Sequence, residues 1–272
     1  MVPGAVPAIR MCIMRISCIK KIAISLSLLA ALAACAASPW KKEQADSHIN
    51  IGIAYLGSER FNDALKEFML AEELTPREPR VHYYMGIAYY EKGLTDKAVH
   101  ALDRAVSLKE DYSEAHNFLG NIYLGMGQWD KAIHAFKEAL ANIVYETPDK
   151  AVFNMGRAYY GKEDYRTALK LYAEAKNKKP NTVPLPLLDH HMGMASYAQG
   201  DYYQASRYFL IALEQAPAFL ESRYWLAHCY VKLHYRDRAR REFQSIIKAA
   251  PESGIAGEAR KSLNSIGAVN PP

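Results

Sequence analysis

The sequence predicts an all-α protein, a right-handed superhelix of six helix-turn-helix repeats with a capping helix after the last one. Two observations predict it. The first is a period of 34 residues in which Gly-x-x-Tyr, or a degenerate form of it, is followed nine residues later by Ala. The second is an aromatic residue or Leu four positions after that Ala in every repeat: Phe68, Leu102, Phe136, Tyr172, Phe209 and Phe243. Self-similarity at a period of about 20 to 50 residues is typical of solenoids.

The repeats are continuous except at two short spacers. They span residues 45–78, 79–112, 113–146, 149–182, 186–219 and 220–253, with two extra residues before the fourth and three before the fifth. A small residue at the eighth position and Ala at the twentieth let two helices approach, and larger residues fill the seam at helical spacing. The pattern resembles the tetratricopeptide repeat (TPR). The resemblance implies a right-handed TPR superhelix in which stacked hairpins bury the apolar faces that one hairpin cannot bury alone.

The ends of the helices are predicted from their local residues. Four second helices are expected to begin at an acidic or amide N-cap, namely Asn62, Asp96, Asp130 and Asp237. Gly93, Gly127 and Gly200 lie in the turns between paired helices, where a positive φ costs Gly nothing. Pro closes four repeats, at Pro76, Pro180, Pro217 and Pro251. Residues 254–272 are expected to form an amphipathic capping helix and a short tail.

Residues 1–34 are predicted to be a lipoprotein signal peptide. Basic residues precede an apolar stretch from Ile22 to Leu32, which is shorter than the roughly 20 residues that span a bilayer. The stretch ends in Leu32-Ala33-Ala34-Cys35, which resembles the lipobox of bacterial lipoproteins. The resemblance implies cleavage before Cys35 and lipidation of that residue. An ordinary signal peptide with an incidental Cys is the alternative.

Lipidation at Cys35 would anchor the protein to a membrane. Several acyl chains hold a protein far more firmly than one does. The next residue is Ala36 and not Asp, which by resemblance to lipoprotein sorting favours the periplasmic face of the outer membrane. Residues 35–44 are expected to form a lipidated tether, and residues 45–253 the repeat domain.

Charge and cysteine content narrow the function classes. The chain has 34 Lys and Arg residues, four of them before Cys35, against 29 Asp and Glu residues, so the mature protein is nearly neutral. A nucleic-acid binder needs a concentrated basic face, and nucleic acid is therefore excluded as a partner. After Cys35 the only cysteine is Cys229, which lies among apolar residues and is expected to be a buried structural thiol.

No residue pattern predicts catalysis, so we expect a protein that is not an enzyme, with no cofactor, metal or small-molecule substrate. His48, His82 and His116 recur at the fourth position of successive repeats, which indicates packing between helices. His190 and His191 are adjacent on a helix and point about 100° apart. Gly-rich phosphate loops, Gly-x-Ser-x-Gly and Cys-x-x-Cys are all absent from the sequence.

A partner protein is expected to bind the groove lined by the first helix of each repeat. Rows of Tyr, Phe and Ile at groove positions are typical of interaction surfaces. The predicted groove residues are Ile49, Ile53, Tyr83, Ile87, Tyr90, Asn117, Asn121, Leu124, Phe153, Asn154, Arg157, Tyr160, His190, Met194, Tyr197, Tyr224 and His228. A second copy, or closure of the superhelix on itself, is the alternative occupant.

Some TPR proteins hold a C-terminal carboxylate with a clamp of Lys, Asn, Asn, Lys and Arg. Here Asn121 and Asn154 stand at the two Asn positions, but Asn117, Leu187 and His191 stand where the cations should be. Without these cations a carboxylate loses its charge-assisted contacts. An apolar helix or strand is therefore the expected ligand.

A lipobox, a short tether and six TPRs together resemble the PilF/PilW/Tgl family of type IV pilus pilotins. The junction Tyr145-Glu146-Thr147-Pro148-Asp149 also resembles an irregular junction of that family. The resemblance implies an outer-membrane lipoprotein that promotes localisation and multimerisation of secretin subunits. The alternative is another lipoprotein TPR adaptor, serving peptidoglycan enzymes or outer-membrane protein assembly. An enzyme is a remote third hypothesis.

Overall fold

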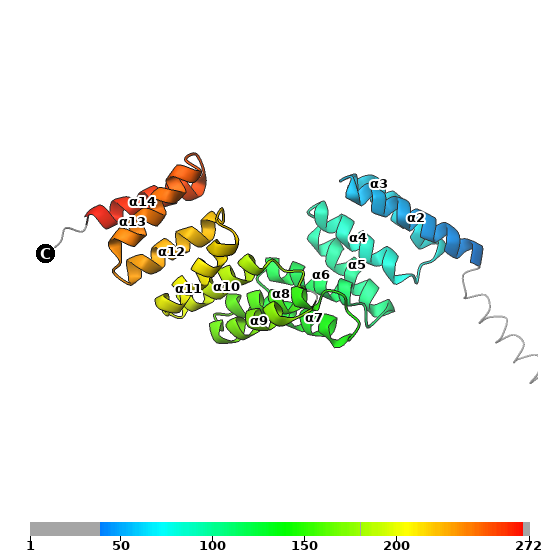
Figure 1. The fold of residues 1–272 in the computed structure, drawn as a ribbon. Coiled ribbons are helices and arrows are strands. Elements are labelled where there is room, and N and C mark those ends of the chain that lie inside the picture. The colour runs from blue at the N-terminus through cyan, green and yellow to red at the C-terminus, as the bar shows by residue number, and fades with distance from the viewer. Residues whose placement is uncertain (1–38, 180, 269–272) are drawn as a thin grey trace, which may run out of the picture. The chain divides into compact units, whose positions relative to one another are not determined.

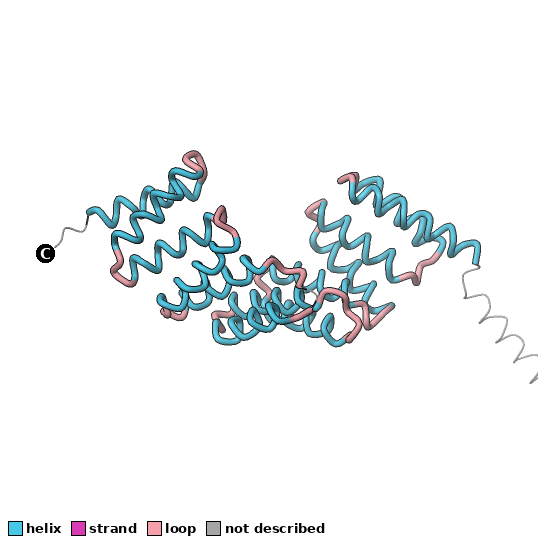
Figure 2. Tube along the Cα trace, viewed as in Figure 1, coloured by secondary structure: helices cyan, strands magenta, loops and turns pink. Residues whose placement is uncertain are grey.

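The computed structural model describes residues 39–179 and 181–268, and within these ranges it contains helices and no strand (Figures 1 and 2). The helices are α2 (Pro39–Gly57), α3 (Phe61–Leu74), α4 (Pro79–Glu91), α5 (Thr95–Leu108), α6 (Ser113–Gly125), α7 (Trp129–Ala141), α8 (Pro148–Gly161), α9 (Tyr165–Asn177), α10 (Leu185–Ala198), α11 (Tyr202–Gln215), α12 (Leu220–Lys232), α13 (Arg236–Ala249) and α14 (Gly254–Ala268). Each predicted repeat holds two consecutive helices, which confirms the all-α prediction. The predicted signal peptide, Cys35, Pro180 and the last four residues lie outside the described ranges.

The chain divides into two compact units, residues 1–93 and 94–272. The described part of the first unit consists of α2, α3 and α4. The second contains α5 to α14. Within each unit, consecutive helices pack against one another. The boundary between the units falls in the turn of the second repeat.

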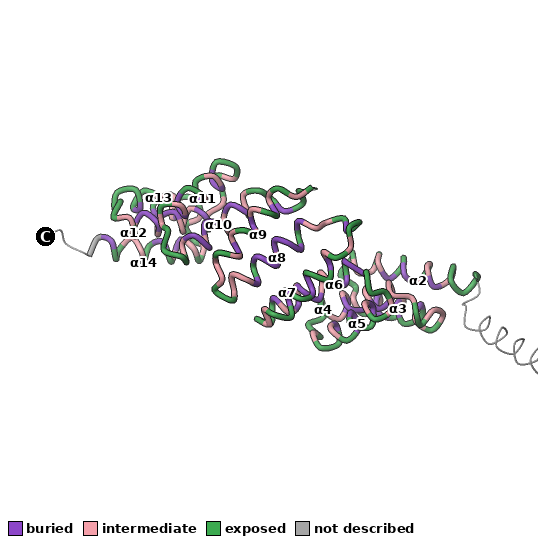
Figure 3. Tube along the Cα trace, turned by 90° about the horizontal axis from the view of Figure 1, so that it is seen from below, coloured by how far each residue is buried: buried purple, intermediate pink, exposed green. Residues whose placement is uncertain are grey.

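The close approach of paired helices depends on a glycine that faces an aromatic ring. A Cβ atom on Gly120 of α6 would lie only 2.5 Å from the ring of Phe136 on α7, and this ring is fully buried. The same arrangement recurs in three other repeats, as Gly52 with Phe68, Gly156 with Tyr172 and Gly193 with Phe209. Figure 3 shows that buried positions recur along most helices, next to exposed ones. The 34-residue pattern therefore encodes a specific contact between the eighth and twenty-fourth positions of a repeat.

The turn between the paired helices uses the left-handed backbone region in all six repeats. Gly93, Gly127 and Gly200 have φ angles of 72°, 70° and 82°, as the sequence predicts. The same fifteenth position in the other three repeats is occupied by Glu59, Glu163 and His234, with φ angles of 58°, 64° and 62°. Positive φ is uncommon for residues with a Cβ. Packing of the two helices fixes the turn even where no glycine is present.

The predicted N-caps are wrong. Asn62, Asp96, Asp130 and Asp237 each lie at the second position inside their helix, and the residue at the cap position makes no side-chain cap bond. The helices begin two residues earlier than predicted, because the left-handed turn ends at the fifteenth position of the repeat. An acidic side chain inside the first turn still interacts favourably with the helix dipole.

Side-chain capping of second helices occurs in two other repeats. The carboxylate of Asp164 accepts a hydrogen bond from the backbone N–H of Thr167 at 3.1 Å, and that of Asp201 from Gln204 at 2.9 Å. Both aspartates directly follow the left-handed residue of their turn. The cap position is thus the sixteenth of the repeat.

The first helix extends into the predicted tether. Helix α2 begins at Pro39, and residues 39–43 are exposed, whereas burial starts with Ala45. Proline suits the first turn of a helix because its missing N–H would have no intrahelical partner there. Residues 39–44 are therefore a helical extension of the first repeat and not an irregular tether.

The C-terminal helix α14 covers the end of the last repeat, as predicted. Its residues Ala256, Ala259 and Ile266 are buried in a cluster with residues of α12 and α13. Glu258 and Arg260 on its other side are exposed. This helix therefore buries the apolar face that a further repeat would otherwise cover.

The spacer before the fifth repeat is held by one buried carboxylate. Asp149, the second residue of α8, is fully buried. It accepts hydrogen bonds from the backbone N–H of Thr182 at 2.6 Å and of Val183 at 2.8 Å, and from the Thr182 hydroxyl at 2.7 Å. The first residue of the fourth repeat is thereby bonded to the last residue of that repeat and to the first residue of the spacer that follows it.

Candidate functional site

In the first unit, the predicted groove residues differ in accessibility. Ile49 is 1 % exposed and packs in the core, so its assignment to the groove is corrected. Ile53, Tyr83 and Ile87 are half-buried, and Tyr90 is exposed. In the first repeat the residue at the fifth position therefore lies in the core, while the ninth position of both repeats and the fifth and twelfth positions of the second repeat are at least partly exposed.

In the second unit, two predicted groove residues also lie in the core. Phe153 is 6 % exposed and contacts the rings of Tyr172 and His191, with centroids 5.7 Å and 5.0 Å away. Leu124 is 8 % exposed. Phe153 is corrected to a core residue because α8 turns this side chain onto α9 and α10. Leu124 keeps one side on the cavity described next.

The candidate site is a cavity of about 370 Å³ on the first helices of the third, fourth and fifth repeats. We name it the α8 pocket. It is lined by Leu124, Trp129, Arg157, Tyr160, Gly161, Tyr172, His190, His191 and Met194. Five of these residues were predicted from the sequence, namely Leu124, Arg157, Tyr160, His190 and Met194. All lining residues belong to the second unit.

Four lining residues were not predicted as groove residues. Trp129 is the first residue of α7, and its ring packs closely against Gly161 of α8. A Cβ atom on Gly161 would lie only 2.8 Å from that ring. Tyr172 is at the seam position that packs against the glycine of its own repeat, so the pattern assigned it to packing only. Its signal in the sequence is that it is the only Tyr at a position otherwise occupied by Phe or Leu.

One edge of the pocket carries a chain of polar contacts. The side-chain amide nitrogen of Asn154 donates to the side-chain oxygen of Asn121 at 2.8 Å. The guanidinium of Arg157 donates to the side-chain oxygen of Asn154 at 3.3 Å. The predicted residue Asn117 is half-buried on the same helix as Asn121, and its side-chain oxygen has no hydrogen-bond partner. Within the described residues, Arg157 forms no ion pair with a carboxylate, so its charge is available to a ligand.

The two histidines of the pocket are neutral at physiological pH. Burial lowers the pKa of His190 to about 4, and burial together with the neighbouring His190 and Arg157 lowers the pKa of His191 to about 3. His190 Nδ1 lies 2.8 Å from the hydroxyl of Ser222 on α12. The ring of His191 lies 5.5 Å from that of Tyr172. These rings act as uncharged walls, while burial raises the pKa of Tyr160 and keeps its hydroxyl protonated.

These depressed pKa values predict a loss of stability in acid. Above the ordinary pKa of 6.5 the histidines are neutral in both states. As the pH falls below 6.5, the unfolded chain binds protons that the folded protein excludes. The free energy of unfolding then decreases by up to about 1.4 kcal/mol per pH unit for each histidine. We expect the free energy of unfolding in urea to fall by about 2 kcal/mol from pH 7.5 to 5.5. The double variant His190→Gln/His191→Gln should show a flatter dependence, and equal slopes would contradict the assignment.

The remaining predicted groove residues form an aromatic cluster on α10 and α12. Tyr197 contacts Trp225 with ring centroids 5.1 Å apart, and Tyr224 contacts His228 at 4.5 Å and Phe243 at 5.9 Å. All but Phe243 are half-buried. Except for Phe243, these aromatic side chains lie on the first helices of the fifth and sixth repeats, and part of each ring packs in the fold.

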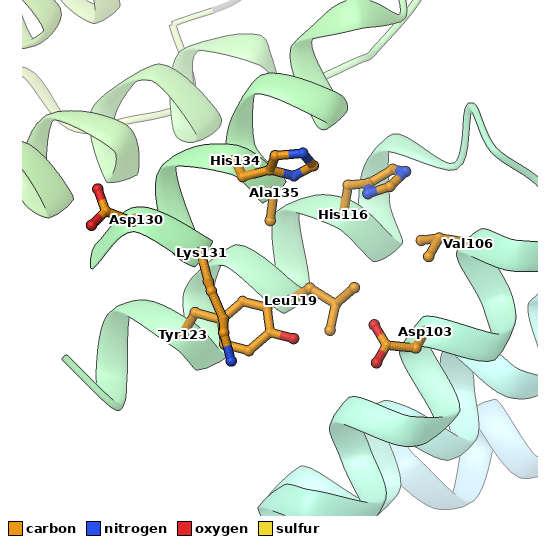
Figure 4. Close-up of a pocket in the computed structure, with 9 residues that line it drawn as sticks. All are labelled: Asp103, Val106, His116, Leu119, Tyr123, Asp130, Lys131, His134 and Ala135. Atoms are coloured by element: carbon orange, nitrogen blue, oxygen red, sulfur yellow. The ribbon is translucent and has the colours of Figure 1, made fainter. Parts of the chain in front are cut away.

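A second cavity of about 490 Å³ lies between α5, α6 and α7 (Figure 4). Leu119 lies in its middle, and Lys131 extends beside Tyr123, with its ammonium 5.4 Å from the ring centroid. Asp103 on α5 and His134 on α7 stand at its edges. All polar groups of this cavity except those of His116 and Tyr123 belong to exposed residues. We therefore place the candidate site at the α8 pocket, which contains a buried hydroxyl without a partner.

The recurring histidines contact protein groups within their own repeat or at the end of the preceding one. His48 Nδ1 lies 2.7 Å from a carboxylate oxygen of Glu67, and the Nε2 atoms of His82 and His116 lie near the backbone oxygens of Pro76 and Glu110. In the described part of the chain, no group of three or more His, Cys, Asp and Glu residues is arranged to hold a metal ion.

Cys229 is fully buried, as predicted, and burial raises the pKa of its thiol to about 12. A thiol with a raised pKa is a poor nucleophile. Among the described helices, none has both the length and the apolar character needed to cross a bilayer.

Comparison with known proteins supports the repeat assignment. A tetratricopeptide-repeat model matches residues 111–177, and a second TPR model matches residues 88–127. Together they cover about a third of the chain. The helix pairs outside these ranges repeat the same seam and turn. The chain has the tetratricopeptide-repeat fold.

Solved TPR structures match most of the chain. PilF of Pseudomonas aeruginosa matches with a TM-score of 0.69 and 16 % identity, over 82 % of this chain and 99 % of that one. PilW, a widely conserved type IV pilus biogenesis factor, matches with a TM-score of 0.72 and 17 % identity, over 79 % and 98 %. YrrB, a TPR protein with an unusual peptide-binding site, matches with a TM-score of 0.57 and 20 % identity, over 71 % and 97 %. Among proteins of curated function, none matches the sequence significantly.

Proposed function

We propose that this TPR protein is an outer-membrane lipoprotein that acts as a type IV pilus pilotin and binds secretin subunits through the first helices of its repeats. TPR proteins are interaction scaffolds, and the binding part of the proposal rests on the α8 pocket. Its walls are largely apolar, and Arg157 there has no carboxylate partner among the described residues. Such a cavity suits a side chain of a partner segment.

The pilus part of the proposal rests on two further facts. The solved chains of PilF and PilW are matched along 99 % and 98 % of their length. The sequence before the first repeat resembles a lipoprotein signal that ends at Cys35. An anchored scaffold of this size is what the pilotin function requires.

The proposed mechanism is physical. Acyl chains on Cys35 hold the repeats at the membrane, and the first helices capture secretin subunits there. Tethering raises the local concentration of bound subunits. Ring assembly then proceeds faster than diffusion away from the membrane or aggregation.

Deletion of the gene, followed by complementation, tests this function. We expect loss of secretin multimers in membrane fractions and loss of pili in electron micrographs. The wild-type gene should restore both, and a Tyr160→Ala variant should restore them poorly. Tyr203→Ala is the matched control, because Tyr203 is 63 % exposed and lies on the second helix of its repeat. Intact secretin multimers and pili in the deletion strain would show that the proposal is wrong.

The second candidate function is a lipoprotein adaptor for peptidoglycan enzymes or outer-membrane protein assembly. It is favoured by the same apolar pocket, which is not specific to one partner. Purification of the lipidated protein from solubilised outer membrane, with and without Tyr160→Ala, separates the two. Recovery of cell-wall hydrolases in place of secretin would support the adaptor.

A further inference from the structure

One buried hydroxyl in the α8 pocket has no hydrogen-bond partner. Tyr172 is fully buried, and no group in the described structure accepts from or donates to its hydroxyl. An unsatisfied buried polar group is costly. Phe or Leu occupies the same seam position in the other five repeats, where no hydroxyl has to be satisfied. The fold alone gives no reason for a Tyr at this position.

Tyr172, which carries this hydroxyl, lines the same cavity as a cation. Tyr172 and Arg157 both line the α8 pocket. Burial raises the pKa of Tyr172, and the charge of Arg157 opposes this rise. Burial lowers the pKa of His191, and the charge of Arg157 acts in the same direction. Within the described ranges, the Arg157 side chain donates a single hydrogen bond, to the side-chain oxygen of Asn154 at 3.3 Å. The pocket is thus lined by two donor side chains that lack a charged acceptor among the described residues.

The other walls set the shape of what can enter. Trp129 and Met194 contribute apolar surface, and the rings of His190 and His191 are neutral and buried. No Asp or Glu residue lines the pocket. The guanidinium of Arg157 is thus the one charged group among the lining residues, and an acceptor with negative charge complements it.

We propose that the α8 pocket binds the carboxylate of an acidic side chain in an extended segment of the partner protein. One carboxylate oxygen accepts from the Tyr172 hydroxyl and the other from the Arg157 guanidinium. An aromatic or aliphatic neighbour of the acidic residue packs on Trp129 and Met194. This inference rests on the binding role proposed above and names the chemistry of the bound segment. It does not depend on the partner being a secretin.

Three N-acetylated peptides test the proposal on the full chain in detergent. They are acetyl-Phe-Glu-Phe-amide, acetyl-Phe-Gln-Phe-amide and acetyl-Phe-Gln-Phe with a free C-terminus. Binding is followed by NMR at the indole N–H of Trp129. We expect the Glu peptide to bind about tenfold more tightly than the Gln amide, since hydrogen bonds to a charged acceptor are the stronger ones. If the free C-terminus restored affinity as well as Glu does, the pocket would bind chain ends and the proposal would be wrong.

Two variants assign the preference to the named donors. Tyr172→Phe removes one oxygen and places at this seam position the residue that four other repeats carry, so it should fold. Arg157→Gln removes the charge. Each should reduce the preference for Glu over Gln to about twofold or less. Arg166→Gln, an exposed residue of α9 outside the pocket, is the matched control and should keep the full preference.

Other outcomes overturn the inference. If Tyr172→Phe kept the preference for Glu, the hydroxyl would bond to water only. If all three peptides failed to shift the Trp129 signal, the pocket would not be a site for an acidic segment. The deletion experiment on secretin multimers is independent of these titrations, so failure of the pilotin function can be told apart from failure of this inference.

Discussion

Replacing Asp149 with Ala should lower the free energy of unfolding by about 3–5 kcal/mol, measured in urea. The carboxylate of Asp149 is fully buried and accepts from the backbone N–H groups of Thr182 and Val183. Without this carboxylate, the buried backbone N–H of Val183 loses its hydrogen-bond acceptor. The loss combines a strong charge-assisted set of hydrogen bonds with an unsatisfied backbone group.

Two milder changes calibrate this prediction. Thr182→Val removes the hydroxyl that contacts Asp149 at 2.7 Å but keeps both backbone bonds, and should cost about 1 kcal/mol. Asp164→Ala removes a carboxylate that caps α9 from a more exposed position, and should cost much less than Asp149→Ala. If Asp149→Ala cost no more than these two variants, the spacer would not depend on the buried carboxylate.

Replacing Phe136 with Ala should also cost about 3–5 kcal/mol, because it opens a cavity between α6 and α7. Phe136 is fully buried, and its ring occupies the space beside Gly120. Chemical denaturation of the variant measures the loss. Phe136→Leu should cost much less, since the second repeat carries Leu102 at this position.

The glycine that faces this ring gives a second test of the same contact. Gly120→Ala alone should cost about 1–3 kcal/mol, because the new Cβ would lie 2.5 Å from the Phe136 ring. In a Phe136→Leu background the cost should shrink, since the side chain in the way is shorter. A double-mutant cycle with no coupling energy would show that the two positions do not share the seam.

The seam and the turns could be predicted from the sequence because one residue type serves one geometric need in each repeat. Position 120 requires a residue without a Cβ atom because the ring of Phe136 fills the space beside it. Gly93 adopts the positive φ of its turn without strain. The start of the second helices could not be predicted in the same way. Asp96 has the chemistry of an N-cap, but the preceding left-handed turn fixes the helix start two residues earlier.

The groove was predicted less completely, for a different reason. A repeat template assigns the same direction to equivalent side chains, yet Ile49 and Phe153 are turned into the core by their own neighbours. Tyr172 contributes both to a seam and to the wall of a cavity, and a pattern assigns it one role only. The position of Trp129 beside Gly161 depends on two different repeats, which a single repeat motif cannot describe.

The buried carboxylate at the start of α8 has a consequence for affinity. It bonds α8 to the segment that leads into α10, and these two helices carry Arg157, His190 and His191 on facing walls of the pocket. Walls that are fixed before a ligand arrives lose little conformational entropy when it binds. A residue that no ligand touches thereby preorganises the recognition surface, and changes at Asp149 would weaken binding by loosening the receptor and not by removing a contact.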